Sequence, residues 1–142
     1  MKRIIYTRLD GGVSVVTPNI NTNEILTEEE ALQRAFDKLP SSAINPQIVE
    51  ANTISSDRTF RNAWEKDEKV IKTNMTKAKD MTKDRLRDER KPLLEAQDVA
   101  FQRALEGNAD TSVIVKEKNR LRDITKQVDR MKTINELKGA TI

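Results

Sequence analysis

The feature that most constrains the fold is a long run without turn-forming residues. Residues 74–106 hold no glycine and a single proline, Pro92, and their apolar positions recur at helical spacing. Gly107 and Asn108 follow, and both residue types commonly end helices. The pattern predicts a long helix over about residues 75–106. Because proline removes a backbone hydrogen bond, Pro92 either bends this helix or divides it into two.

A second helix is predicted over about residues 111–132. Its apolar side chains follow the steps of a heptad seam, with Glu117 as a polar interruption. The turn at residues 107–110 lets the two helices close as an antiparallel hairpin. Such a seam most often packs within its own chain, and the alternative is a contact with another chain. The seam residues are Ile114, Leu121, Ile124, Val128 and Met131.

The start of the chain predicts a β-hairpin. Residues 3–8 and 13–17 are rich in β-branched and aromatic side chains. Gly11 and Gly12 lie between them and can take the positive φ that a tight turn requires.

A short helix and further strands are predicted next. Thr27 with Glu30 three residues later is a capping box, and the helical spacing that follows ends at Pro40. Residues 47–54 are predicted to be extended, and residues 69–73 suit a last short strand. The small sheet needs the helix to cover one of its faces.

Together these elements predict an α+β protein. A small N-terminal β-β-α-β unit, with a further strand at its end, occupies residues 1–73, and its junction lies at about residues 55–73. A helical hairpin or coiled-coil-like arm occupies residues 74–142. The chain is 142 residues long, which is enough for one domain with an extension.

Composition excludes several classes of function. The chain has no histidine and no cysteine, which removes the commonest metal ligands, a Ser-His-Asp triad and a thiolate nucleophile. No glycine-rich phosphate loop or nucleophile elbow occurs. We therefore expect no enzyme activity and no cofactor. No apolar run is long enough to span a membrane.

Nucleic-acid binding is a less favoured alternative. The 26 lysines and arginines nearly balance the 23 acids. In residues 77–91 the cations alternate with carboxylates, and no aromatic residue lies between Trp64 and Phe101 to stack on bases. The alternating charges instead predict a solvated helix face with local pairs such as Asp84 with Arg87.

The junction between the two parts is dense in informative residue types. One interpretation is structural: Phe60 and Trp64 pack one helical turn onto the sheet, and Asp57 caps that turn. The other is a contact patch, because arginine and tryptophan are enriched at binding hot spots. Arg58 and Arg61 would belong to that patch.

Several stretches resemble small proteins of the tail and tail-fibre modules of tailed bacteriophages and prophages. They are residues 3–8 with 10–16, residues 57–65, and residues 103–106 with 121–124. Residues 84–124 are similar to the group called phage tail assembly chaperones.

The resemblance implies a non-enzymatic assembly protein that binds a phage tail or tail-fibre protein. It would act in the host cytoplasm during assembly, alone or as a homo-oligomer. The alternative is a permanent minor component of the virion. The apolar inventory supports a partner, because only 36% of residues are hydrophobic and an isolated hairpin would be marginally stable. The candidate contact residues are Arg58, Phe60, Arg61, Trp64, Phe101, Leu105, Leu121, Ile124 and Val128.

Overall fold

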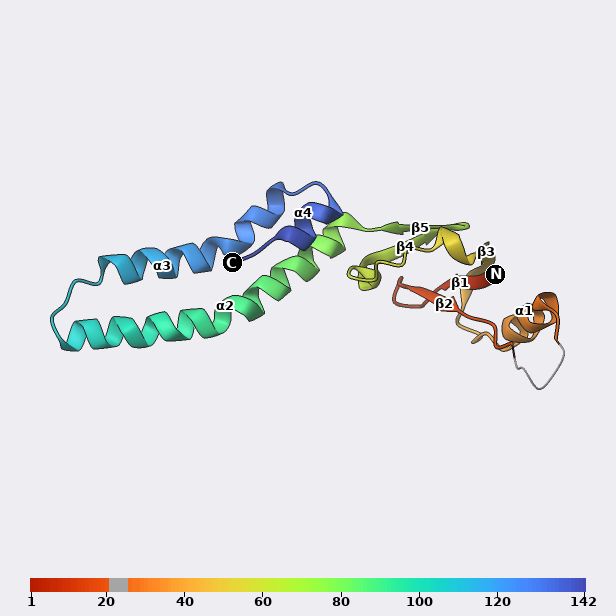
Figure 1. Ribbon diagram of the computed structural model, residues 1–142, viewed down its shortest axis with the longest axis horizontal. Helices are drawn as coiled ribbons and strands as arrows, with labels where there is room; N and C mark the ends of the chain where they lie inside the picture. The colour runs from red at the N-terminus through yellow and green to blue at the C-terminus, as the bar shows by residue number, and fades with distance from the viewer. Residues whose placement is uncertain (21–25) are drawn as a thin grey trace. The chain divides into compact units, whose positions relative to one another are not determined.

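The computed structural model of the chain describes residues 1–20 and 26–142. The described residues divide into two compact units, Met1–Asn74 and Met75–Ile142. The first, here called the N-terminal unit, combines strands with a short helix. The second, the C-terminal unit, is helical (Figure 1). The α+β class predicted from the sequence is confirmed.

The predicted hairpin at the start of the chain is confirmed. Strands β1 (Lys2–Thr7) and β2 (Val13–Val16) pair in antiparallel fashion. Gly11 has a φ of 82°, so its lack of a side chain is needed there. The Arg8 amide donates to the Gly12 carbonyl at 2.8 Å, which closes the turn.

Helix α1 (Glu28–Asp37) begins with the predicted capping box. The Glu30 amide donates to the Thr27 hydroxyl, and the Thr27 amide donates to the Glu30 carboxylate. These bonds satisfy amide groups that the helix leaves without partners. Ala31 and Leu32 are the buried residues of the helix.

Strand β3 (Ile44–Glu50) pairs with the other edge of β1, which gives an antiparallel sheet in the order β2-β1-β3. The predicted extended segment, residues 47–54, was placed too late. The strand starts before Pro46, which is tolerated because β3 is an edge strand. It stops at Glu50 because Ala51–Thr53 forms a 3₁₀ turn.

The last strands of the N-terminal unit form a second hairpin, β4 (Trp64–Asp67) and β5 (Val70–Thr73). The strand predicted at residues 69–73 is confirmed. Strand β4 was not predicted. Glu68 makes the tight turn between the two strands with a φ of 51°.

A helical turn lies between Phe60 and Trp64 as predicted, with both aromatic side chains buried, but its predicted cap is wrong. The turn is a 3₁₀ helix over Arg61–Ala63, and Trp64 is the first residue of β4. Asp57 does not cap it. Its carboxylate instead accepts hydrogen bonds from the Thr59 amide and hydroxyl.

The core of the N-terminal unit lies on one face of the β2-β1-β3 sheet, where Ile5 packs with Trp64 of β4. Successive strand residues point to opposite faces, so Ile4 points to the face on the other side, which carries α1. Both isoleucines are fully buried. The core residues beside β4 are Ile5, Val13, Val49 and Trp64.

Helix α2 (Met75–Glu106) runs without interruption through Pro92. Of the two arrangements that the sequence left open, the single helix is the one that forms. The helix changes direction about halfway along its length (Figure 1). A bend is the usual effect of a proline inside a helix.

The end of α2 is a Schellman motif centred on Asn108, which has a φ of 52°. The Asn108 amide donates to the Leu105 carbonyl, and the Ala109 amide donates to the Ala104 carbonyl at 2.8 Å. The predicted stop is therefore confirmed, and the left-handed residue is Asn108.

The helix predicted over residues 111–132 is only partly correct. Helix α3 (Ser112–Asp123) gives way to a 3₁₀ helix, Ile124–Arg130, and a further helix, α4 (Ile134–Gly139), was not predicted. Both kinds of helix bring residues three apart to nearly the same side, so a short 3₁₀ stretch is not separated from an α-helix by a step of three in the apolar pattern. Thr133 caps α4, because its hydroxyl accepts a hydrogen bond from the Glu136 amide.

The C-terminal unit has its own core. Helix α2 packs against α3, the 3₁₀ helix and α4. The buried residues are Ala78, Thr82, Leu86, Leu121, Val128, Leu137 and Ala140.

Candidate protein-binding surfaces

The four candidate residues at the junction separate into two kinds. Phe60 and Trp64 are buried, and Trp64 belongs to the core of the N-terminal unit. Arg58 and Arg61 are exposed. The aromatic side chains therefore stabilise the fold, and the two arginines are the part of this cluster that a partner could reach.

The candidate residues of the predicted seam lie mainly inside the C-terminal unit. Leu121 and Val128 are fully buried, and Ile124 is partly buried. They belong to the region where α2 packs against α3 and the 3₁₀ helix. The sequence left open whether these residues shape the hairpin or form a contact surface, and their burial favours the first.

Phe101 and Leu105 occupy different surroundings from Leu121. The Lys118 ammonium lies 5.0 Å from the centre of the Phe101 ring and 2.6 Å from the Asp98 carboxylate. This arrangement joins α2 to α3 by a cation–π contact and an ion pair. Leu105 is 55% exposed. The sequence did not single out Lys118, because its partners Phe101 and Asp98 lie on a different helix.

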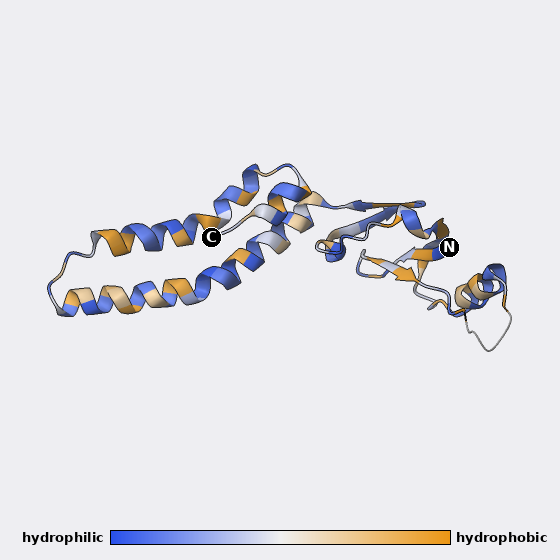
Figure 2. Ribbon diagram, in the orientation of Figure 1, coloured by the Kyte–Doolittle hydropathy of each residue, from blue (hydrophilic) through white to orange (hydrophobic). Residues whose placement is uncertain are grey.

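The helical hairpin has buried side chains only in the half that lies away from its turn. Across residues 87–120, no side chain falls in the buried class. Orange apolar positions nevertheless recur along α2 and at the start of α3 (Figure 2). The apolar residues most exposed near the turn are Leu105, Val113 and Val115, with exposed fractions of 55%, 77% and 40%. We call these three residues the apolar tip.

Hydrogen bonds from α2 arginines hold the other half of the hairpin together. The Arg90 guanidinium donates to the Leu121 and Arg122 carbonyls at the end of α3. Arg85 donates to the carbonyl of Leu137 in α4 and to that of Ala140, which follows the helix. Cations at helix C-termini satisfy carbonyls that have no partner within the helix.

Charged groups on the helices pair both within one helix and between elements. Lys83 contacts Asp129 at 2.6 Å, and this hydrogen bond lowers the pKa of the Asp129 carboxyl. Arg120 donates to Glu117, which lowers the pKa of Glu117 and raises that of Arg120. The predicted pair of Asp84 with Arg87 is confirmed at 2.7 Å.

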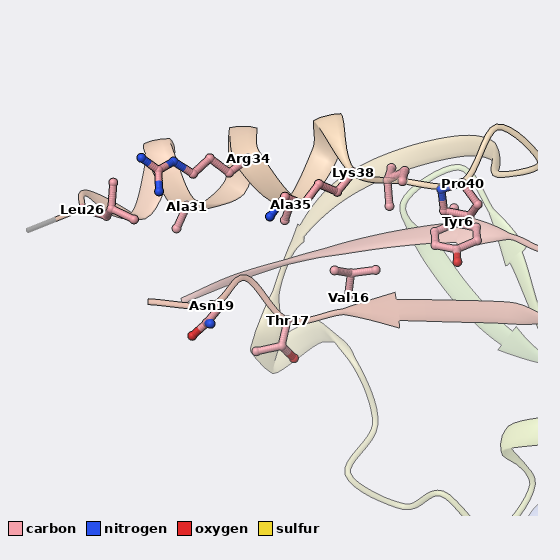
Figure 3. A pocket seen from close by; sticks show the side chains of 11 residues that line it. Tyr6, Val16, Thr17, Asn19, Leu26, Ala31, Arg34, Ala35, Lys38 and Pro40 are labelled. Carbon is pink, nitrogen blue, oxygen red and sulfur yellow. The ribbon is translucent and has the colours of Figure 1, made fainter. Parts of the chain in front are cut away.

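A groove of about 410 Å³ lies between α1 and the β1-β2 hairpin (Figure 3). Arg34 comes from α1 and Lys38 from the residue that follows it, and Tyr6 and Val16 come from the strands opposite. The lining combines cations, a phenol and apolar groups. Among the residues that the structure describes, this lining includes no carboxylate. The lining residues are Tyr6, Val16, Thr17, Asn19, Leu26, Ala31, Arg34, Ala35, Lys38, Leu39 and Pro40.

A second groove surrounds the open edge of β3. Its walls come from β3 on one side and from β5 on the other, and Ile48 and Val70 are both exposed there. The volume is about 700 Å³. Its lining mixes apolar side chains with charged ones such as Lys2, Glu50 and Lys69. Sequence reasoning did not foresee this groove, because it depends on how two strands far apart in sequence are placed.

Within residues 1–20 and 26–142, no cluster of three or more acidic side chains is arranged to hold a metal ion. No helix in the same ranges has the length and apolar character needed to cross a bilayer. Comparison with protein-family models, with curated proteins and with solved structures gives no match for this chain.

Proposed function

We propose that this chain is a non-enzymatic assembly protein of a tailed bacteriophage that binds a phage tail or tail-fibre protein through the apolar tip. The observation that carries the proposal is the exposure of Leu105, Val113 and Val115 on a half-hairpin that has no buried side chain. The three residues lie close together in sequence, on either side of the turn at residues 107–110. Exposed apolar surface is a feature of interaction sites.

Burial against a partner would stabilise this part of the hairpin. Full burial of a valine or leucine side chain contributes roughly 1.5–3 kcal/mol. The residues of the apolar tip would gain part of this free energy on binding a partner. The core residues of the C-terminal unit are already buried within the chain. A partner that presents an apolar groove or helix face fits this chemistry.

The resemblance to phage tail-module proteins supports the kind of partner. Residues 103–106 end α2, and residues 121–124 end α3 and begin the 3₁₀ helix. The similar stretch, residues 84–124, includes the whole apolar tip. The phage role rests on this resemblance, and the binding role rests on the exposed tip.

A pull-down from infected cells tests the proposal. The tagged full chain is expected to co-purify with a tail or tail-fibre protein, and Val113→Asp or Leu105→Asp is expected to abolish this capture. Because both side chains are exposed, neither change should unfold the chain. Asn119→Asp adds the same charge at another exposed position of α3 and should leave capture unchanged.

Retained capture by folded Val113→Asp and Leu105→Asp chains would remove the tip from the mechanism. Mass spectrometry of purified virions then separates the assembly role from a permanent structural role. An assembly protein leaves the particle, whereas the chain at fixed copy number in finished particles would identify a virion component.

A further inference from the structure

The outer face of α2 near the turn carries a regular pattern of exposed residues. Lys91, Glu95, Val99 and Arg103 follow one another at four-residue steps, and Glu106 lies one turn further along. Residues four apart lie on the same side of a helix. Val99 is 51% exposed at the middle of this face. A shallow groove of about 460 Å³ runs beside it, lined by Asp98, Val99, Gln102, Arg103 and Glu106.

The charges of this face have no partners within the described chain. Lys91, Glu95, Arg103 and Glu106 form no ion pair with any residue in the ranges 1–20 and 26–142. The contrast with Asp98 is informative, because that carboxylate is already paired with Lys118 across the hairpin. The outer face therefore presents two cations and two anions that remain free for another molecule.

The order of these charges is complementary to itself. When two copies of the helix lie antiparallel with Val99 against Val99, each residue before Val99 faces a residue equally far beyond it. Glu95 then faces Arg103 of the second copy. Lys91 of one copy lies opposite position 107 of the second copy. It is therefore offset from Glu106 of that copy by one residue along the helix axis, or about 1.5 Å. Every one of the four free charges meets an opposite charge.

A parallel arrangement gives the reverse result. It would place Glu95 against Glu95 and Arg103 against Arg103, and like charges in contact are unfavourable. The charge pattern thus selects both the occupant and its direction.

We propose that the outer face of α2, centred on Val99, binds a second copy of this chain in antiparallel orientation. The contact is isologous, because the same patch serves both copies around a two-fold axis. It is distinct from the apolar tip, so the proposal does not depend on the proposed function. A dimer formed in this way carries two apolar tips.

Sedimentation equilibrium of the full chain tests the proposal. The wild type is expected to show a monomer–dimer equilibrium that weakens as salt is added, since exposed charges are screened. Glu95→Arg and Arg103→Glu each turn both symmetry-related pairs into like-charge contacts. Each is expected to weaken the dimer by about tenfold or more. The double variant Glu95→Arg with Arg103→Glu restores opposite charges and is expected to dimerise nearly as well as the wild type.

Two controls make the outcome decisive. Lys116→Glu reverses an exposed charge on α3 and should leave dimerisation unchanged, and circular dichroism should show the same helix content in every variant. A wild type that stays monomeric at all concentrations would overturn the proposal. A double variant as weak as the single ones would overturn it, and so would a dimer abolished by Val113→Asp but unaffected by the charge reversals.

Discussion

Lys83 and Asp129 link α2 to the 3₁₀ helix by a short ion pair. Their charged atoms lie 2.6 Å apart, and Lys79 adds a longer hydrogen bond to the Asp129 carbonyl. The hydrogen bond from Lys83 is the main reason why the pKa of Asp129 lies below its usual value. Hydrogen bonds to the charged form of a carboxyl favour that form.

The pair gives the folded state a dependence on acidity. A carboxyl whose pKa is lowered by folding contributes stability above its unfolded pKa, and this contribution is lost as the pH falls through the folded pKa. The relevant range is below about pH 4. Lys83→Met should therefore raise the pKa of Asp129, which a carboxyl titration by NMR would measure. Lys132→Met, at an exposed lysine nearby, should leave it unchanged, and identical titrations for the wild type and Lys83→Met would contradict the assignment.

At the scale of elements, the end of α2 depends on one residue. Asn108 holds the left-handed conformation, whereas Gly107 lies outside the positive φ range. A side-chain carbon added to Gly107 would meet its nearest neighbour, the Arg103 carbonyl, at an ordinary distance of 3.5 Å. The residue that the turn needs is thus the asparagine, even though glycine is the commoner choice there.

Substitutions at these two positions should have opposite effects. Asn108→Val forces a β-branched residue into the left-handed region and should destabilise the C-terminal unit by roughly 1–2 kcal/mol. Gly107→Ala should be neutral or stabilise it by up to about 1 kcal/mol, because alanine restricts the unfolded chain. Urea unfolding followed by circular dichroism would measure both effects. The reverse order would show that Gly107 makes the turn.

The sequence was sufficient to predict elements whose signals are local. The Thr27 capping box, the Gly11 turn and the run without glycine before residue 107 each act through neighbouring residues, and the structure has all three. The errors arose where local signals are ambiguous or weak. Strand β4 begins directly after a 3₁₀ turn, and α4 is only six residues long.

For the candidate surfaces too, the sequence was sufficient where the signal is local and insufficient where tertiary structure decides. The heptad spacing correctly picked out Leu121 and Val128 as residues that pack, because spacing determines which side of a helix they occupy. It could not tell that Leu105, a candidate contact residue, would stay exposed. Val113 lies outside the predicted seam, which passes through Ile114. The difference in burial depends on how closely the two helices approach at each level, which is a property of the tertiary structure.

At the scale of the whole molecule, each unit has a core of its own. Trp64, the chain's sole tryptophan, lies in the core of the N-terminal unit, while Leu121 lies in the core of the C-terminal unit. The two units can therefore be followed by different signals. Tryptophan fluorescence reports on the first, and helical circular dichroism reports mainly on the second.

A cavity in one core should lower the stability mainly of the unit that contains it. Leu121→Ala should destabilise the C-terminal unit by about 2–5 kcal/mol, the usual range for such a change at a buried site. The circular dichroism transition should move to lower temperature while the fluorescence transition stays in place. Ile5→Ala serves as the reciprocal variant and should move the fluorescence transition instead. Transitions that shift together in both variants would show that the units unfold as one.

The uneven burial along the hairpin has a kinetic consequence. Local opening is easiest where few apolar contacts must be broken, so the helical turns on either side of Gly107 should separate first. Backbone amides there should exchange with heavy water far sooner than those around Leu86 and Leu121. The hairpin would thus open first at its turn. A ligand bound there could be released while the rest of the chain stays folded.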